Sequence, residues 1–222
     1  MKDFGAYKGV YYRNFRSANP GDPDALYNEA HDAVLADSTH ELVLTYGQRI
    51  NIDGTYVGVM IRRIAVWCNT ATLPDDCTII SAQLRLDIRK MTMVGYTPKW
   101  DWYVKIRAGE DLNSNIVYNE LANYSRILAM GTEIGSKYAD EFLIGTQKYW
   151  FLSVPPQFIN KTGYTVFTSL SSKDEAKVKP ADGSVTEEVV FAYDPHDGFF
   201  RLRVNYATGV SNKAYALARE EL

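Results

Sequence analysis

Cysteine and histidine are scarce in this sequence. Among its 222 residues there are two cysteines and three histidines, and neither an HExxH nor a CxxC motif is present. The common zinc-site patterns are therefore excluded. Cys68 and Cys77 flank a Pro-Asp-Asp turn. They are expected to be a free, partly buried pair if the chain is made in the cytoplasm, and a disulfide across the turn is the alternative.

Motifs of well-known active sites are missing as well. The sequence contains no GxSxG elbow, no GxGxxG turn and no Walker phosphate loop. No two carboxylates are placed recognisably as a general acid and a general base. We therefore expect a protein that is not an enzyme. A polysaccharide-degrading enzyme on a β scaffold is the alternative, because its carboxylates can be hard to recognise in sequence.

Long hydrophobic runs and a charge excess are also lacking. No segment approaches the roughly 20 apolar residues that a membrane-spanning helix needs, so no membrane partner is expected. The formal net charge of −3 gives no basic footprint for nucleic acid, and no nucleic-acid partner is expected. The first residues, MKDFGAYKGVYYRNF, have no apolar signal core. We expect either use without Sec export or a leader that has been cut away.

What the chain has instead is the alternation of β-strands. Eight segments rich in β-branched and aromatic residues predict strands at residues 41–46, 56–67, 78–88, 102–107, 150–154, 164–170, 189–193 and 199–206. In the third, the residues predicted to face the core are Ile80, Ala82, Leu84, Leu86 and Ile88, and those predicted to face outward are Ser81, Gln83, Arg85, Asp87 and Arg89. The pattern predicts an all-β fold, an antiparallel jelly-roll-like sandwich with short helices and an extended N-terminal arm.

The N-terminal residues 1–25 differ in composition from the rest. They mix Tyr7, Tyr11, Tyr12 and Phe15 with lysine and arginine, and they end at the turn NPGDPD. We interpret them as a docking arm whose aromatic side chains contact a partner protein or a second copy of the chain. The alternative is that the arm packs back on its own domain.

The rest of the chain divides into a sandwich at residues 26–207 and a tail at residues 208–222. Helical spacing of alanine and leucine after Ser211 predicts a helix in the tail. A second short helix is predicted at residues 117–129. No internal repeat is visible, so a single large domain is expected.

An aromatic cluster is the best candidate for a binding surface. Aromatic residues make up 13% of the chain, and the segment YTPKWDWYVKI concentrates four of them. Trp102 has the parity of the core-facing residues, whereas Tyr96, Trp100 and Tyr103 are candidates for stacking on sugar rings. The alternative is that these three side chains fill one end of the core or pack under a loop.

Two acidic turns are candidates for a calcium site. Asp75 and Asp76 lie in the turn of LPDDC, and Asp194 and Asp197 lie in YDPHDGFF. Carboxylate and carbonyl oxygens are the ligands that Ca²⁺ prefers. Asp is also favoured in turns for local backbone hydrogen bonding, which explains both segments without a metal. No other cofactor is expected.

The order of the strands resembles a known family. The run RRIAVW…TLPDDCTIISAQLRLDI is similar to the core of DNRLRE-type modules, the disaggregatase-related β-sandwich modules of bacterial, archaeal and phage proteins. AHDAVLADSTHELVLTYG, KYWFLSVPPQFINKTGYTVFTSLSS and FFRLRVNY resemble further strands of that family in the expected order. The resemblance spans residues 26–206. It departs from the family at Trp67-Cys68 and at Ser153-Val154-Pro155, so no binding residue is carried over.

The resemblance implies a non-catalytic module. Such modules are associated with polysaccharide binding or adhesion, and related jelly rolls serve in phage heads and tails. We therefore expect a structural or decoration protein of a virion, such as a capsid, head-fibre or tail component. Its partners would be other virion proteins, further copies of itself or a surface glycan. The alternative is an extracellular or cell-surface module for carbohydrate binding or adhesion.

Overall fold

The computed structural model describes residues 1–18, 22–39, 43–50, 57–92, 98–179, 187–191 and 200–208. Antiparallel strands dominate these ranges, so the predicted all-β class is confirmed. The strands are β1 (Lys2–Ala18), β2 (Asp37–Thr39), β3 (Val43–Ile50), β4 (Val57–Asn69), β5 (Thr78–Met91), β6 (Tyr103–Ala108), β7 (Thr132–Tyr138), β8 (Lys148–Val154), β9 (Tyr164–Ser171), β10 (Glu187–Phe191) and β11 (Phe200–Ala207). The helices are α1 (Pro23–His31), α2 (Glu110–Asn115), α3 (Asn123–Ala129) and α4 (Ser172–Glu175), with short 3₁₀ turns η1 (Ala139–Glu141) and η2 (Pro156–Phe158).

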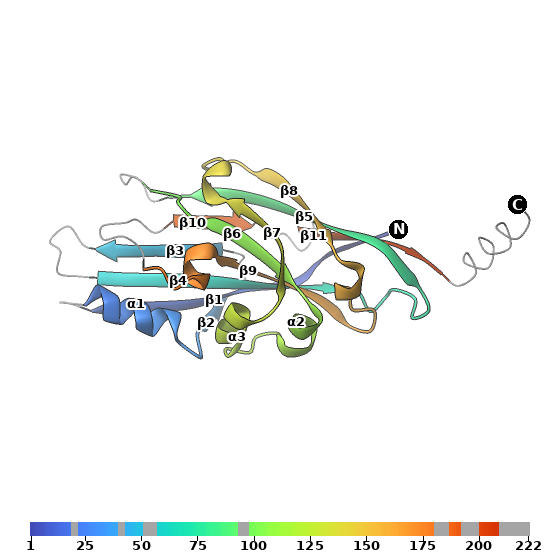
Figure 1. Cartoon of the computed structure of the whole chain (residues 1–222), viewed down its shortest axis with the longest axis horizontal. Coiled ribbons are helices and arrows are strands. Elements are labelled where there is room, and N and C mark those ends of the chain that lie inside the picture. The colour runs from blue at the N-terminus through green and yellow to red at the C-terminus, as the bar shows by residue number, and fades with distance from the viewer. Residues whose placement is uncertain are drawn as a thin grey trace, which may run out of the picture.

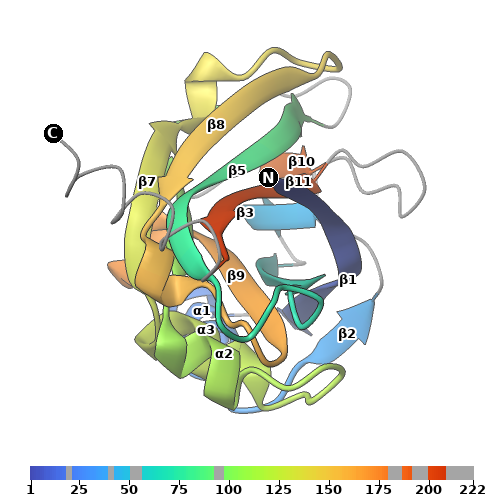
Figure 2. The ribbon, with the colours of Figure 1, turned by 90° about the vertical axis from the view of Figure 1, so that its right-hand side faces the viewer.

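The strands form a barrel-like sandwich of two layers (Figure 1, Figure 2). Sheet A runs in the order β8–β5–β11–β1, and the far end of β5 continues through β10 to β3. Sheet B runs in the order β7–β6–β9–β4–β1–β2. The ring β1–β11–β5–β10–β3–β4 closes because β1 pairs with β11 at its start and with β4 along most of its length.

Apolar side chains fill the space between the two sheets. Leu84 and Leu86 of β5 point into it from sheet A, and Trp102, directly before β6, and Phe167 of β9 meet them from sheet B. All four side chains are at most 1% exposed. Burying each of them stabilises the fold by roughly 1.5–3 kcal/mol relative to an exposed position. The inter-sheet core is therefore the main source of stability.

A second core lies between sheet B and the helices. Strand β4 is buried on both faces, because Ile64 points into the inter-sheet core while Ile61 and Trp67 pack under α1, α2 and α3. Tyr124 of α3 is fully buried in this second core. Helices α1, α2 and α3 lie on one side of the barrel, and β5 and β8 lie on the opposite side (Figure 1, Figure 2). The two outer faces of the sandwich consequently have different surroundings.

Arg63 ties the helices to sheet B. Its guanidinium, which is fully buried, donates to both carboxylate oxygens of Asp174 at 2.7 and 2.9 Å. It also donates to the backbone carbonyls of His31 and Tyr124 and lies 3.9 Å from the centre of the Tyr124 ring. One side chain of β4 thus contacts α1, α3 and α4. The ion pair and the hydrogen bonds offset the desolvation penalty of burying its charge.

The prediction of a separate N-terminal arm at residues 1–25 is wrong. Residues 2–18 form β1, which has hydrogen-bonded neighbours on both sides, and α1 follows it. Tyr11 is 6% exposed and Tyr12 is 0% exposed, so these two side chains pack in the chain's own cores and not against a partner. The side chains of Tyr7 and Phe15 lie outside the described part. Aromatic alternation in this segment reflects a strand buried on both faces.

The other predicted elements agree with the structure to different degrees. All eight predicted strands are present, and β1, β2, β7, α1 and α2 were not predicted as such. Only the second half of the helix predicted at residues 117–129 forms, as α3. The helix predicted after Ser211 lies outside the described residues. Within the described chain, every helix is too short and too polar to span a bilayer.

The alternation of β5 is confirmed with one exception. Ala82, Leu84 and Ile88 are buried as predicted, but Ile80 is 58% exposed. The register with β11 shifts at this point, since Ser81 pairs with Asn205 whereas Ile79 pairs with Tyr206. Ile80 is the extra residue of a β-bulge, which reverses the parity of the strand beyond it.

Candidate functional site

The outer face of sheet A carries the most distinctive group of exposed side chains. Four neighbouring strands contribute to it, and we call it the arginine–aromatic face. Its members are Tyr149, Phe151 and Ser153 of β8, Gln83, Arg85 and Asp87 of β5, Arg201 and Arg203 of β11, and Asp3 of β1. They lie together because alternate residues of a strand point to the same side, and register places them opposite one another.

Arg85 is held at the centre of the face. Two of its N–H groups donate to the Asp87 carboxylate, with both distances 3.1 Å. Its guanidinium carbon lies 4.4 Å from the centre of the Tyr149 ring, which is 57% exposed. The hydrogen bonds that Arg85 donates to the Asp87 carboxylate raise the pKa of Arg85 above its ordinary value. Asp87 itself is only 1% exposed although it has outward parity, so the Arg85–Asp87 pair is fixed in place.

A second ion pair stands at the edge of the face. Arg203 donates through Nε to Asp3 Oδ1 at 2.8 Å and through Nη2 to Oδ2 at 3.2 Å. These hydrogen bonds lower the pKa of the Asp3 carboxyl below its ordinary value. Asp3 therefore stays ionised at neutral pH and presents an acceptor beside the arginines. Both side chains are about half exposed and within reach of solvent.

Two arginines occupy directly opposite positions in the middle of the face. Arg201 on β11 pairs in register with Arg85 on β5, and Phe151 is the neighbour of Arg85 on the other side. Like charges at directly opposite positions destabilise a sheet. Gly5 of β1 pairs with Arg201 on its other side, and a Cβ added to Gly5 would have no atom within 4 Å. One row of the face thus reads Phe151, Arg85, Arg201, Gly5 across four strands.

The face is hollowed into a groove of about 240 Å³. The lining residues are Asp3, Gln83, Arg85, Phe151, Arg201 and Arg203. Three arginines and one aspartate give this lining a positive charge although the whole chain has a net charge of −3. Phe151, which is 55% exposed, supplies a flat apolar surface. The groove therefore combines an aromatic ring, charged donors and polar acceptors.

Two of the three residues of the predicted aromatic cluster, Trp100 and Tyr103, lie in the described part of the chain, and they differ in exposure. Trp100 is 3% exposed, so its prediction as a stacking residue is wrong. It adopts a left-handed backbone with φ of 51°, and Glu187 accepts hydrogen bonds from its backbone N–H and from Trp102 Nε1. These contacts turn both tryptophans into the core. Tyr96 lies outside the described residues.

Tyr103 has the exposure that was predicted for it. It is 48% exposed, and its ring centre lies 5.1 Å from that of Tyr138 on the neighbouring strand β7. The pair belongs to sheet B, whereas the groove belongs to sheet A. Tyr103 is therefore a second exposed aromatic position, well suited as a comparison for Phe151.

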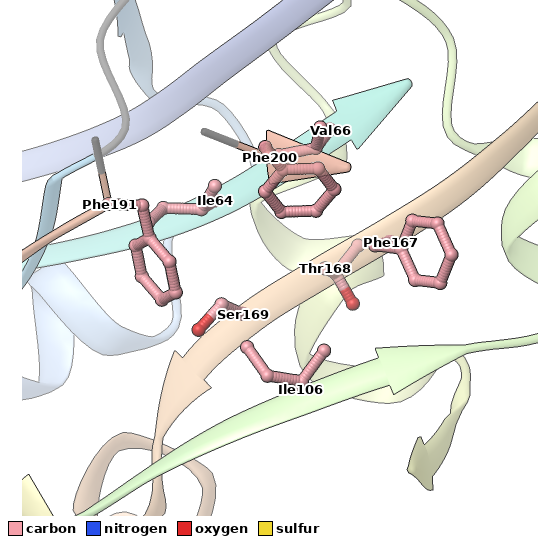
Figure 3. A pocket seen from close by; sticks show the side chains of 8 residues that line it. All are labelled: Ile64, Val66, Ile106, Phe167, Thr168, Ser169, Phe191 and Phe200. Carbon is pink, nitrogen blue, oxygen red and sulfur yellow. The ribbon is translucent and has the colours of Figure 1, made fainter. Parts of the chain in front are cut away.

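The interior of the sandwich offers no room for a sugar or cofactor at its described pocket. This pocket lies between the sheets and has a volume of about 10 Å³, enough for roughly one water molecule (Figure 3). The side chains that line it are Ile64, Val66, Ile106, Phe167, Thr168, Ser169, Phe191 and Phe200. Among the described residues, the hydroxyls of Thr168 and Ser169 find no hydrogen-bond partner. We interpret this pocket as a packing feature of the core.

Metal ligands do not converge in the described part of the chain. No group of three or more histidine, cysteine, aspartate or glutamate side chains there could hold an ion. In the first turn predicted for Ca²⁺, Asp75 and Asp76 are exposed, and Lys161 Nζ donates to the Asp75 carbonyl at 2.8 Å. The Lys161 ammonium therefore occupies a carbonyl oxygen that could otherwise serve as a Ca²⁺ ligand. The second turn, with Asp194 and Asp197, lies outside the described residues.

The two cysteines and His31 are structural in their surroundings. Cys68 and Cys77 are free and buried, and burial raises the pKa of the Cys68 thiol. A buried neutral thiol of this kind is a weak nucleophile. His31 is 6% exposed, and its ring nitrogens contact Asp32 and the Asp174 carbonyl. It belongs to the hydrogen-bond network around Arg63.

The alternation of three strands in the sequence indicates which residues of the groove point outward. The outward parity of Arg85 was predicted, and the alternation of FFRLRVNY and KYWFLSV places Arg201, Arg203 and Phe151 outward as well. No protein-family model matches the chain, and no curated protein matches it. The resemblance to DNRLRE-type modules therefore stays a prediction.

Proposed function

We propose that the chain is a non-catalytic glycan-binding module and that it binds sugar through the arginine–aromatic face. The observation that carries this proposal is the groove in which an exposed Phe151 ring lies beside charged donors and acceptors. Sugar rings have flat C–H faces that pack on aromatic rings, and their hydroxyl groups exchange hydrogen bonds with Asp, Gln and Arg side chains.

The placement of the groove also favours binding over structural support. The opposed arginines Arg85 and Arg201 are unfavourable for sheet stability. Positions that oppose stability are often explained by function. Helices cover the part of the outer face of sheet B that β1, β4 and β9 form, whereas the outer face of sheet A leaves Phe151 and Tyr149 more than half exposed.

A glycan array followed by titration calorimetry tests the proposal. We expect the intact chain to bind at least one class of polysaccharide, and Phe151→Ala to weaken that binding by about tenfold or more, the loss expected for one aromatic contact of about 1.5 kcal/mol. Tyr103→Ala is the matched control, because Tyr103 is similarly exposed but lies on the other sheet. Binding that responds to Tyr103→Ala and not to Phe151→Ala would move the site to the Tyr103–Tyr138 pair.

The assignment to a virion is a separate proposal about where such a module acts. It rests on the resemblance to phage-associated jelly rolls and predicts assembly with other virion proteins or with further copies of the chain. Size-exclusion chromatography with light scattering tests the second possibility. A closed trimer or larger ring would favour a particle component, and a monomer at high concentration would favour a cell-surface or extracellular module.

A further inference from the structure

We infer that the ligand of the arginine–aromatic face is an acidic polysaccharide, one that carries carboxylate or sulfate groups on its sugar rings. This inference rests on the proposed glycan-binding function and names the class of glycan. It depends on the arrangement of three arginines within one groove.

The register of the sheet places the three arginines at the corners of a triangle, and all three line the groove. Arg85 and Arg201 are directly opposite, about 5 Å apart at their Cα atoms, and Arg203 lies two residues further along β11, about 7 Å from Arg201. An anionic group that enters the groove beside Arg85 and Arg201 would be attracted by both. Guanidinium groups also match the planar oxygen pairs of a carboxylate.

The ion pairs of the face leave donor capacity for such a group. The Asp87 carboxylate takes two of the five N–H donors of Arg85, and Asp3 takes two of those of Arg203. Both arginines are thus oriented in advance by a carboxylate. A fixed guanidinium loses less side-chain entropy when a ligand binds, and this lowers the cost of recognition.

The other lining residues favour an acidic sugar over a polyanion such as nucleic acid. Asp3 and Gln83 supply acceptor oxygens that suit the hydroxyl groups of a sugar, which a phosphate backbone does not offer. Phe151 offers a stacking surface next to Arg85 in the same row. A uronic acid ring has all three complementary features, namely a flat apolar face, hydroxyl donors and a carboxylate.

Titration with matched polymers tests this inference. Polygalacturonate and its fully methyl-esterified form differ in charge but share a backbone, and heparin supplies sulfate as the anion. We expect polygalacturonate or heparin to bind and the methyl ester to bind at least about tenfold more weakly. Which of the two acidic polymers binds assigns the anion to carboxylate or sulfate. We also expect the affinity to fall as NaCl is raised from about 50 mM to about 0.5 M, because salt screens exposed charges.

Three variants link the binding to the groove. Arg201→Gln and Arg203→Gln remove one charge each and should weaken polygalacturonate or heparin binding about tenfold each. Arg13→Gln is the matched control, since Arg13 is a partly exposed arginine paired with Asp37 on sheet B. Gly5→Ile keeps every charge but adds a β-compatible side chain beside Arg201 in open space, and it should also weaken binding.

The outcomes separate the class of glycan from the function itself. Equal affinity for polygalacturonate and its methyl ester, with loss in Phe151→Ala, would overturn the acidic ligand and leave the glycan-binding proposal standing. Equal affinity for an oligothymidylate strand and for the acidic polymers would overturn the inference of an acidic polysaccharide ligand and indicate non-specific binding of negative charge. An absence of binding to every polysaccharide would overturn both proposals.

Discussion

The two outer faces of the sandwich use arginine in opposite ways. On the helix-covered face of sheet B, Arg63 is fully buried, and its donors are directed to Asp174 and to two backbone carbonyls. On the face of sheet A, Arg203 is about half exposed, and Arg85 shares the floor of a groove with two other arginines. The surroundings of a guanidinium therefore decide its role. Where partners saturate it the side chain stabilises the fold, and where they only orient it the side chain can meet a ligand.

The largest change in stability is expected when the buried cation of the helix-covered face is removed. Arg63→Met leaves the Asp174 carboxylate buried without its cation, and we expect the free energy of unfolding to fall by about 3–5 kcal/mol. Chemical denaturation followed by circular dichroism measures this. The double variant Arg63→Met, Asp174→Leu should lose less than Arg63→Met alone, because no uncompensated charge remains. A loss below about 1 kcal/mol for the single variant would contradict the role assigned to Arg63.

A smaller effect is expected at the contact between α3 and α1. The hydroxyl of Tyr124 donates to the Ala30 carbonyl at 2.7 Å, and the tyrosine is fully buried. Tyr124→Phe leaves that carbonyl without its donor and should reduce the free energy of unfolding by about 1–2 kcal/mol. The same assay measures it. Tyr103→Phe, at an exposed tyrosine, is the control and should change stability by less than about 0.5 kcal/mol.

A pH-dependent effect is expected at the rim of the covered face. Hydrogen bonds from Lys177 and then from His31 lower the pKa of Asp32 below its ordinary value of 3.8. The pKa of Asp32 is therefore lower in the folded chain than in the unfolded chain. The ionised Asp32 carboxylate stabilises the fold above about pH 4, and this stabilisation is lost as the pH falls through the lowered pKa.

Lys177→Met tests this linkage. At pH 7 the variant should be less stable by under about 1 kcal/mol, since Asp32 and Lys177 are about half exposed. The difference from the parent should shrink as unfolding is measured at successively lower pH below 4. A difference that is constant from pH 7 to pH 2 would assign the effect to packing and not to the ion pair.

The smallest expected change in stability lies on the open face and has the opposite sign. Arg201→Gln removes the repulsion with Arg85, so the free energy of unfolding should stay equal or rise by up to about 0.5 kcal/mol. Thermal unfolding of the ligand-free chain measures it. A loss of more than about 1 kcal/mol would show that Arg201 supports the fold, and the contrast between the two faces would weaken.

Sequence periodicity predicted the strands well because each buries at least one face. The eight predicted strands contain alternating or continuous apolar residues, and all eight form. The N-terminal segment was misread because lysines and arginines are interleaved with its tyrosines, as in a docking arm. Tyr12 in that segment is covered by helices from distant parts of the sequence, and no local pattern indicates this.

The groove could be predicted only in part. Alternation indicates that Arg85, Arg201 and Phe151 point outward, but it does not indicate that β8, β5 and β11 are neighbours. That adjacency depends on pairings between residues at least 60 positions apart in sequence, such as Ile88 with Lys148. For Trp100, the position at the entrance of a strand predicts exposure, but the side chain is buried. Its burial depends on Glu187, which is 87 positions away in sequence and accepts its backbone N–H.

The pairing of β1 with β11 has a consequence for how the chain reaches this structure. Asp3 and Arg203 are 200 positions apart, so one wall of the groove forms only when nearly the whole chain has been brought together. Contacts of such long range slow folding, because a large loop must close before they contribute. The arginine–aromatic face should therefore be completed among the last events of refolding, after the inter-sheet core has condensed.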